Sequence, residues 1–170
     1  NNKIKKYKYW MSNIRKFRKH MLNKDLEKLL QDKNLTSRNA WIKLFDETIA
    51  SLKFDFKTKK LSSAEVLNLL SDSNSSNRKL AAASLGKVLK QNVRIFSTIT
   101  NTLAKDKFIS DNWRKYPNPV RSRNLSNAIE DEVVEALSQS ITSSYSKLSH
   151  RYYSIKAKWF KVNALNYWDR

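Results

Sequence analysis

The sequence predicts an all-α, multi-helix bundle with at most one short β-hairpin, near residues 52–61. The 170 residues include one glycine and two prolines, so few residues would interrupt a helix. Apolar residues recur at spacings of three and four through most of the chain, which is the period of one helix face. At this length the chain can bury a core of its own, as one or two small domains.

Residues 1–20 are predicted to form a basic amphipathic helix, with no acidic residue before Asp25. Two interpretations stay open: a docking helix of a larger protein, or an element that binds a polyanion or a membrane. His20, at the end of this helix, is expected to be a surface side chain rather than a metal ligand. The apolar side is marked by Ile4, Tyr7, Trp10 or Met11, Ile14, Phe17 and Met21.

Residues 21–91 are predicted to be a helical domain. Asn23 begins a short helix. The alternating segment 52–56 could be a strand, but no convincing second strand follows, so a minor hairpin is the most that we expect. Ser62 and Glu65 have the spacing of a capping box at the start of another helix. The polar segment 71–77 reads as a linker.

Residues 92–170 are predicted to hold further helices. A single long helix is expected from Asn77 to about Lys105, and two prolines disfavour helix at 116–119. Asn127 and Glu130 fit a capping arrangement for the next helix. The apolar positions of that helix and of the last one follow helical spacing: Ile129, Val133, Leu137 and Ile141, then Leu148, Tyr152, Ile155, Trp159 and Val162.

Two clusters could bind ligands, although a structural role is the more common one for each. Acidic residues at 130–135 could attract a divalent cation. Calcium, however, takes about six to eight oxygens, so we expect helix-dipole compensation and pairing with Arg121 or Arg123 instead. The aromatic set could stack nucleic-acid bases, but at helical spacing we expect it in the core. This set is Tyr152, Tyr153, Trp159, Phe160, Tyr167 and Trp168.

The net charge of +19 is the one compositional extreme. Such a charge can attract RNA or an anionic membrane. The basic residues are dispersed at helical spacing without an RNA-binding motif, which favours solvated helix faces over a nucleic-acid surface. There is no cysteine, which excludes disulfides and fits a reducing compartment.

Several blocks carry a resemblance to a known family. Toward the C-terminus they are TNTLAKDK, NWRKYPNPVRSRNLSNAIEDEVVEAL, LSHRYYSIKAKWF and YWDR, and upstream they are TSRNAWIKLFDE, LSSAEVLNLLSD and NRKLAAASL. From about Met11 to Arg170 the chain resembles the oligoendopeptidase F family of zinc metallopeptidases. The family often has glycine where this chain has Lys161, and a glycine-bearing turn where it has residues 57–60.

The resemblance covers the part of the family that precedes the zinc motif. It implies a helical N-terminal domain at 21–91 and the first helices of a peptidase catalytic domain at 92–170. The family's HExxH motif, whose two histidines bind zinc and whose glutamate acts as general base, is absent here, because Met21 follows His20 and Arg151 follows His150. No catalytic or metal-binding residue is therefore predicted in this chain, and its substrate-binding residues are not predicted either.

By this resemblance the chain is the N-terminal part of a cytoplasmic zinc metalloendopeptidase that hydrolyses short peptides. It would form part of the substrate-channel wall, pack against a C-terminal catalytic half and be inactive alone. Zinc is implied for the full-length family and not for this segment. The alternatives are a basic helical protein that binds RNA or an anionic membrane, and a gene remnant without function.

Overall fold

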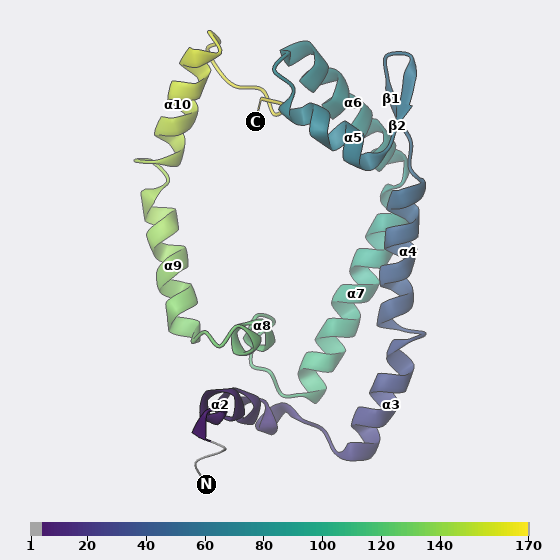
Figure 1. The fold of residues 1–170 in the computed structure, drawn as a ribbon, viewed down its shortest axis with the longest axis vertical. Helices are drawn as coiled ribbons and strands as arrows, with labels where there is room; N and C mark the ends of the chain where they lie inside the picture. Colours follow the sequence, from purple (N-terminus) through teal and green to yellow (C-terminus); the bar gives the residue numbers. More distant parts are fainter. Residues whose placement is uncertain (1–4, 170) are drawn as a thin grey trace. The chain divides into compact units, whose positions relative to one another are not determined.

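The computed structural model describes residues 5–169, and it confirms an all-α fold with one small hairpin (Figure 1). The chain divides into two compact units, and each is described by itself. Unit 1 combines the described residues up to Asn39 with Thr102–Ser143, and unit 2 combines Ala40–Asn101 with the described residues from Ser144 on. Ile4, which we expected in the first helix, lies outside the described residues.

Unit 1 is built from short helices and the second part of one longer helix. Asn23 begins α3 as predicted, because its side-chain oxygen accepts a hydrogen bond from the Leu26 backbone N–H at 2.9 Å. The elements are α2 (Lys8–Lys16), the 3₁₀ helix η1 (Arg18–His20), α3 (Lys24–Asn34), the second part of α7 (Val93–Trp113), α8 (Arg121–Ser126) and α9 (Asp131–Ser144), whose last residue belongs to unit 2.

Unit 2 contains the hairpin and the helices that pack on it. Strands β1 and β2 are antiparallel, with Phe54 opposite Leu61, so the minor hairpin predicted near residues 52–61 is confirmed. Figure 1 shows the hairpin beside α5 and α6. The elements are α4 (Arg38–Ser51, in unit 2 from Ala40), β1 (Phe54–Phe56), β2 (Lys59–Leu61), α5 (Ser63–Asn68), η2 (Leu69–Ser71), α6 (Ser75–Gln91), the first part of α7 and α10 (Ser149–Trp159).

The core of unit 2 forms where the hairpin meets α5, η2 and α6. Small alanines on α6 let the hairpin and the neighbouring helices approach closely, and Trp168 near the end of the chain packs against the same cluster. Away from this cluster, Phe45 of α4 meets Phe96 of α7 edge to face, with ring centroids 5.8 Å apart. The buried members of the cluster are Phe54, Val66, Leu70, Ala81, Ala82 and Val88.

The capping box predicted at the start of α5 is confirmed. The Ser62 hydroxyl accepts a hydrogen bond from the Glu65 backbone N–H, and the Glu65 carboxylate accepts one from the Ser62 backbone N–H at 2.7 Å. Each side chain therefore satisfies a backbone donor that the first turn of a helix leaves without a partner. Glu65 also accepts a bond from the Ser62 hydroxyl, and these bonds hold the pKa of Glu65 below its usual value.

The prediction of one long helix from Asn77 to Lys105 is wrong. The segment forms two helices, because α6 ends at Gln91 and α7 begins at Val93. Asn92 between them leaves helical geometry, with φ −104° and ψ 9°. Its side-chain amide donates to the Val88 carbonyl at 2.9 Å, so a local side-chain bond competes with the regular helix there.

The cap predicted from Asn127 and Glu130 is also wrong. Asn127 ends α8 instead, and Ala128 then adopts a left-handed conformation with φ +55°. The next helix, α9, begins only at Asp131, whose carboxylate accepts a hydrogen bond from the Asn124 side chain at 2.8 Å. The expected acidic first turn is present in α9, but it consists of Asp131 and Glu132.

Large apolar side chains on α9 and α10 are exposed, which corrects the expectation that the aromatic set lies in a core. Trp159 is 68% exposed, and Tyr152 and Tyr153 are also exposed, whereas Trp168 is packed against the unit 2 core. Nothing in the described chain covers the exposed members. Helical spacing produces an apolar stripe on one side of a helix, but it does not determine whether another element packs against that stripe. Among the described residues no helix is both long enough and apolar enough to cross a bilayer.

Candidate functional site

His20 is buried, which corrects the prediction of a surface side chain. It is 4% exposed, and its ring stacks on Tyr116 with the centroids 4.0 Å apart. Its Nδ1 donates a hydrogen bond to the Arg114 carbonyl oxygen at 2.8 Å, while its Nε2 is buried without a partner in the described chain. The histidine therefore joins η1 to the end of α7 within unit 1.

Arg114 completes this contact by binding Glu27 through two hydrogen bonds. The guanidinium nitrogens donate to the two carboxylate oxygens at 2.7 and 2.8 Å, and one of them also reaches the His20 carbonyl at 3.3 Å. The bonds from Arg114 lower the pKa of Glu27 from 4.5 to about 2, helped by a bond from the Leu22 backbone N–H. A carboxylate whose pKa is this low is a weak general base near neutral pH, and both of its oxygens are already bonded to Arg114.

The residues present do not fit a zinc site. No group of three or more histidine, cysteine, aspartate or glutamate side chains within residues 5–169 is arranged to hold a metal ion. His20 is committed to its contacts in unit 1, and the exposed His150 lies in unit 2. We therefore derive no metal-dependent step from this chain.

The acidic cluster around the start of α9 pairs with basic side chains. Asp131 lies 3.0 Å from the Arg121 guanidinium, as expected, and Glu130 accepts a bond from Lys16 at 3.1 Å. Hydrogen bonds from Asn124 and then Arg121 lower the pKa of Asp131. These pairings occupy two of the carboxylates considered for a divalent cation, and Arg123, the other predicted partner, forms no ion pair in the described chain.

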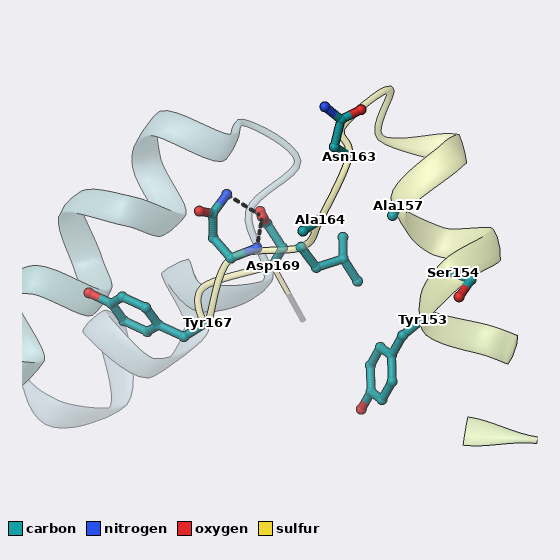
Figure 2. Close-up of a pocket in the computed structure, with 9 residues that line it drawn as sticks. Tyr153, Ser154, Ala157, Asn163, Ala164, Tyr167 and Asp169 are labelled. Carbon is teal, nitrogen blue, oxygen red and sulfur yellow. Dashed lines mark hydrogen bonds between the residues drawn. The ribbon is translucent and has the colours of Figure 1, made fainter. Parts of the chain in front are cut away.

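Each unit has a cavity that is a candidate binding site. The cavity in unit 2, of about 540 Å³, is shown in Figure 2. Tyr153, Ser154 and Ala157 line it from α10, and the segment after the helix supplies the rest, including Asn163 and Tyr167. The lining combines hydroxyl and amide side chains with the apolar side chains of two alanines and a leucine.

A buried ion pair holds Asp169, one of the residues that line this cavity. Asp169 bonds the Arg78 guanidinium at 2.6 Å, and both side chains are less than a tenth exposed. The other carboxylate oxygen of Asp169 accepts bonds from the backbone and side chain of Asn166, drawn as dashed lines in Figure 2. Arg78 also lies over the Phe160 ring, 5.1 Å from its centroid.

The hydrogen bonds that Asp169 accepts lower its pKa, and the bond from Arg78 has the largest effect. Burial of the carboxyl group opposes this shift. Both carboxylate oxygens are engaged, so Asp169 acts as a positioning group for the segment that lines the cavity. The hydroxyl of Ser154 donates to the His150 carbonyl and is not paired with a base. Among the described residues that line the cavity in unit 2, no nucleophile is paired with a base.

The cavity in unit 1 is an apolar groove of about 510 Å³ between α3 and the end of α7. Leucines of α3 form one side, and Ile109 and Trp113 form the other. Trp113 is exposed although it lines the groove. No side chain of the groove was predicted as a site residue, because its leucines have the same helical spacing as core residues and spacing alone cannot show which face stays uncovered.

Two lysines in turns have a left-handed backbone, a conformation that glycine adopts most readily. Lys57, in the two-residue turn of the hairpin, has φ +54°, and Lys161, just after α10, has φ +56°. At α10 the Val162 N–H bonds the Ala157 carbonyl at 3.0 Å, which is a helix-ending motif that favours glycine at the intervening left-handed residue. This chain keeps the turn geometry without the glycine.

Comparisons with known proteins found similarities to this chain in sequence and in fold. A family model described as Oligopeptidase F matches residues 1–54. The fold is similar to that of oligoendopeptidase-F from Enterococcus faecium, with a TM-score of 0.77 and 21% sequence identity over 99% of this chain. The alignment spans 34% of that protein, so this chain corresponds to about a third of its length. No curated protein sequence matches the chain.

Proposed function

The chain resembles oligoendopeptidase F in its N-terminal sequence and its fold, and from this premise we propose that it is the N-terminal part of a zinc metalloendopeptidase that hydrolyses short peptides. The likeness of fold over nearly the whole chain is the observation that carries the proposal. A shared fold positions equivalent walls and cavities, although function depends on the site. The zinc and the residues that bind it would lie in a part of the protein outside this chain.

In this proposal residues 21–91 form the helical N-terminal domain and residues 92–170 the first helices of the catalytic domain. Helix α6 ends and α7 begins at this proposed boundary, and both sides of the break belong to unit 2. The basic segment 1–20 precedes both domains. We place the enzyme in the cytoplasm, as is usual for the family that the chain resembles.

The proposed role of this chain is to form part of the wall of the substrate channel. The cavity lined by α10 and the segment after it supports this role, because it offers Tyr153, Asn163 and Tyr167 to a peptide while Asp169 holds the segment in place. The exposed apolar residues of α9 and α10 would pack against the C-terminal catalytic half. Such faces occur on monomeric proteins mainly where a partner binds.

A peptidase assay tests the first part of this proposal. The purified chain, incubated with zinc and an internally quenched peptide of about ten residues, is expected to show no cleavage. Cleavage that a chelator abolishes would overturn the assignment of the chain as a catalytically incomplete part.

Photo-crosslinking tests the proposed wall. A substrate-length peptide carrying a benzophenone group, irradiated with the complete enzyme, is expected to label the segment from Tyr153 to Tyr167. Tyr153→Ala should reduce this labelling, whereas the matched change Tyr145→Ala, also at an exposed tyrosine but outside the cavity, should leave it unchanged. Labelling confined to other parts of the enzyme would contradict the role as a wall.

A further inference from the structure

We propose that α2 and the basic hollow beside it form a docking surface for an anionic lipid bilayer. This surface is defined by Tyr7, Trp10 and Ile14 on its apolar side and by Arg15, Arg18 and Lys19 on its basic side. The inference is independent of the proposed peptidase role, since it concerns a face of unit 1 that lines neither of the two cavities described above.

The apolar side is a stripe along one face of α2 that the described chain leaves uncovered. Tyr7, Trp10 and Ile14 are separated by three and four residues, and they are 51%, 62% and 48% exposed. Met11 and Phe17 extend the same face and are half-buried. An amphipathic helix of this kind, with aromatic and aliphatic residues opposite basic ones, lies in the interface of a bilayer with its apolar face among the acyl chains.

The basic side flanks this stripe. Arg15, Arg18 and Lys19 are exposed and have no acidic partner among the described residues. Lys5, Lys6 and Lys8 continue the positive charge toward the start of the helix, and no acidic residue precedes Asp25. Basic groups near an anionic membrane each contribute about 1 kcal/mol of attraction at physiological salt, roughly a fivefold gain in binding.

The basic side chains of this surface line a hollow between α2, η1 and α8. The hollow has a volume of about 490 Å³ and is lined by four basic residues of the first two elements, by Arg121, by the buried Leu125 and by the carboxylate-bearing Glu130. Asp131 and Glu130 hold Arg121 and Lys16 in place, so these two are neutralised, and the three unpaired cations named above supply the net positive charge. Such a hollow suits the phosphate of a lipid headgroup.

The contacts of His20 hold this surface in place against the rest of unit 1. The buried ring, stacked on Tyr116 and bonded to the Arg114 carbonyl, anchors the residue that directly follows Lys19. The buried His20 therefore fixes the position of η1, which carries the basic residues Arg18 and Lys19.

The composition of the stripe favours a bilayer over a nucleic acid. Nucleic-acid bases stack on aromatic rings and gain little from exposed aliphatic side chains. Here Ile14, Met11 and the exposed Met21 accompany the aromatic residues, which suits burial among acyl chains.

Vesicle sedimentation with the whole chain tests the proposal. Vesicles of phosphatidylcholine with about one third phosphatidylglycerol are compared with pure phosphatidylcholine at low and high salt. We expect binding at least tenfold tighter to the anionic vesicles at low salt, and a marked loss at high salt. Equal binding to both vesicle types would overturn the proposal.

Two matched pairs of variants separate this surface from the general positive charge. Trp10→Ala should weaken binding about tenfold, whereas Trp159→Ala, at an exposed tryptophan of unit 2 that lines none of the cavities described, should not. The double change Arg18→Gln with Lys19→Gln should weaken binding roughly tenfold or more, whereas Lys87→Gln with Lys90→Gln on α6 should have little effect. Equal losses within either pair would contradict a specific surface, and circular dichroism confirms that each variant is folded.

Two further outcomes would also overturn the proposal. If an RNA oligonucleotide binds more tightly than the anionic vesicles and with the same dependence on Trp10, the surface is a nucleic-acid site. If a longer product of the same gene no longer binds vesicles, another part of that protein covers the stripe. Binding by the longer product that still depends on Trp10 supports the bilayer surface.

Discussion

Glu27 and Arg114, which lie 87 positions apart in the sequence, form an ion pair through two hydrogen bonds of 2.7 and 2.8 Å. The pair joins α3 to the residue that follows α7, and the same guanidinium reaches the carbonyl of His20. Three separate segments of unit 1 thus meet at one arginine. This relationship explains how short helices with few buried side chains keep a defined arrangement within the unit.

The ion pair should make the stability of the chain depend on pH. Because Arg114 lowers the pKa of Glu27 to about 2, the stabilisation is complete above the unfolded value of 4.5 and is lost as the pH falls toward 2. We expect Glu27→Gln to reduce the free energy of unfolding by about 1–2 kcal/mol at pH 7, since part of each side chain reaches water and is screened.

Denaturant titrations at pH 7 and near pH 2 measure this effect. The difference between wild type and Glu27→Gln should shrink at the lower pH. Asp32→Asn, at an exposed position of α3 without a described partner, is the matched control and should cost little at either pH. A difference that grows toward acid pH would contradict the assigned pair.

The buried pair of Asp169 and Arg78 should contribute more to stability. Asp169→Asn leaves a buried guanidinium without its counter-charge, and such a loss costs about 3–5 kcal/mol. Thermal unfolding would show it as a lowered Tm. Asp55→Asn removes the exposed pair with Lys60 and should leave the Tm nearly unchanged, so similar Tm losses for the two variants would refute the difference in burial.

The two histidines should differ sharply when replaced. His20→Ala removes a buried ring, its stacking on Tyr116 and its bond to the Arg114 carbonyl, and we expect a loss of about 2–3 kcal/mol. His150→Ala, at an exposed position, should be close to neutral. Chemical denaturation of both variants measures their free energies of unfolding. Equal values would contradict the burial of His20 and would fit the surface position predicted from the sequence.

Local chemistry in the sequence predicted much of the fold. The capping box of Ser62 and Glu65, the cap at Asn23 and the minor hairpin near 52–61 all depend on neighbouring residues, and the structure confirms them. The break at Asn92 was missed because asparagine is tolerated within helices, and its bond to the Val88 carbonyl is visible only in three dimensions. The burial of His20 depends on Tyr116, far along the chain, so no local pattern could reveal it.

The candidate sites could be predicted only in part. The pairing of Asp131 with Arg121 was expected from charge. The cavity between α10 and the following segment was not, because it depends on the ion pair from Asp169 to Arg78 across 91 positions. The exposure of the aromatic set could not be predicted for a similar reason. Helical spacing identifies an apolar stripe such as that of Trp159, but it does not show whether another surface covers the stripe.

Backbone conformation offers a stabilising test at the end of α10. Lys161 is left-handed with φ +56°, which costs a non-glycine residue about 1 kcal/mol, so Lys161→Gly should raise the free energy of unfolding by about that amount. Lys158→Gly, at an exposed position inside the same helix, should lower it by about 1 kcal/mol. Urea unfolding of both variants checks the prediction, and a loss of stability in Lys161→Gly would contradict the left-handed assignment.

At Gly86 in α6, replacing a glycine, instead of introducing one, is expected to stabilise the chain. A Cβ built at Gly86 meets nothing within 4 Å, and the residue is exposed within a helix. Gly86→Ala should therefore stabilise the chain by about 1 kcal/mol through its higher helix propensity. Destabilisation in the same urea experiment would show a close neighbour at this position and contradict the open space around it.

The coding DNA immediately beyond the codon for Arg170 tests whether this chain is the N-terminal part of a zinc metalloendopeptidase. If the chain is the N-terminal part of a zinc peptidase, the reading frame continues into a segment that contains HExxH, as the account predicts. A frame that stops at once, or that continues at length without HExxH, would contradict the assignment to a working zinc metallopeptidase.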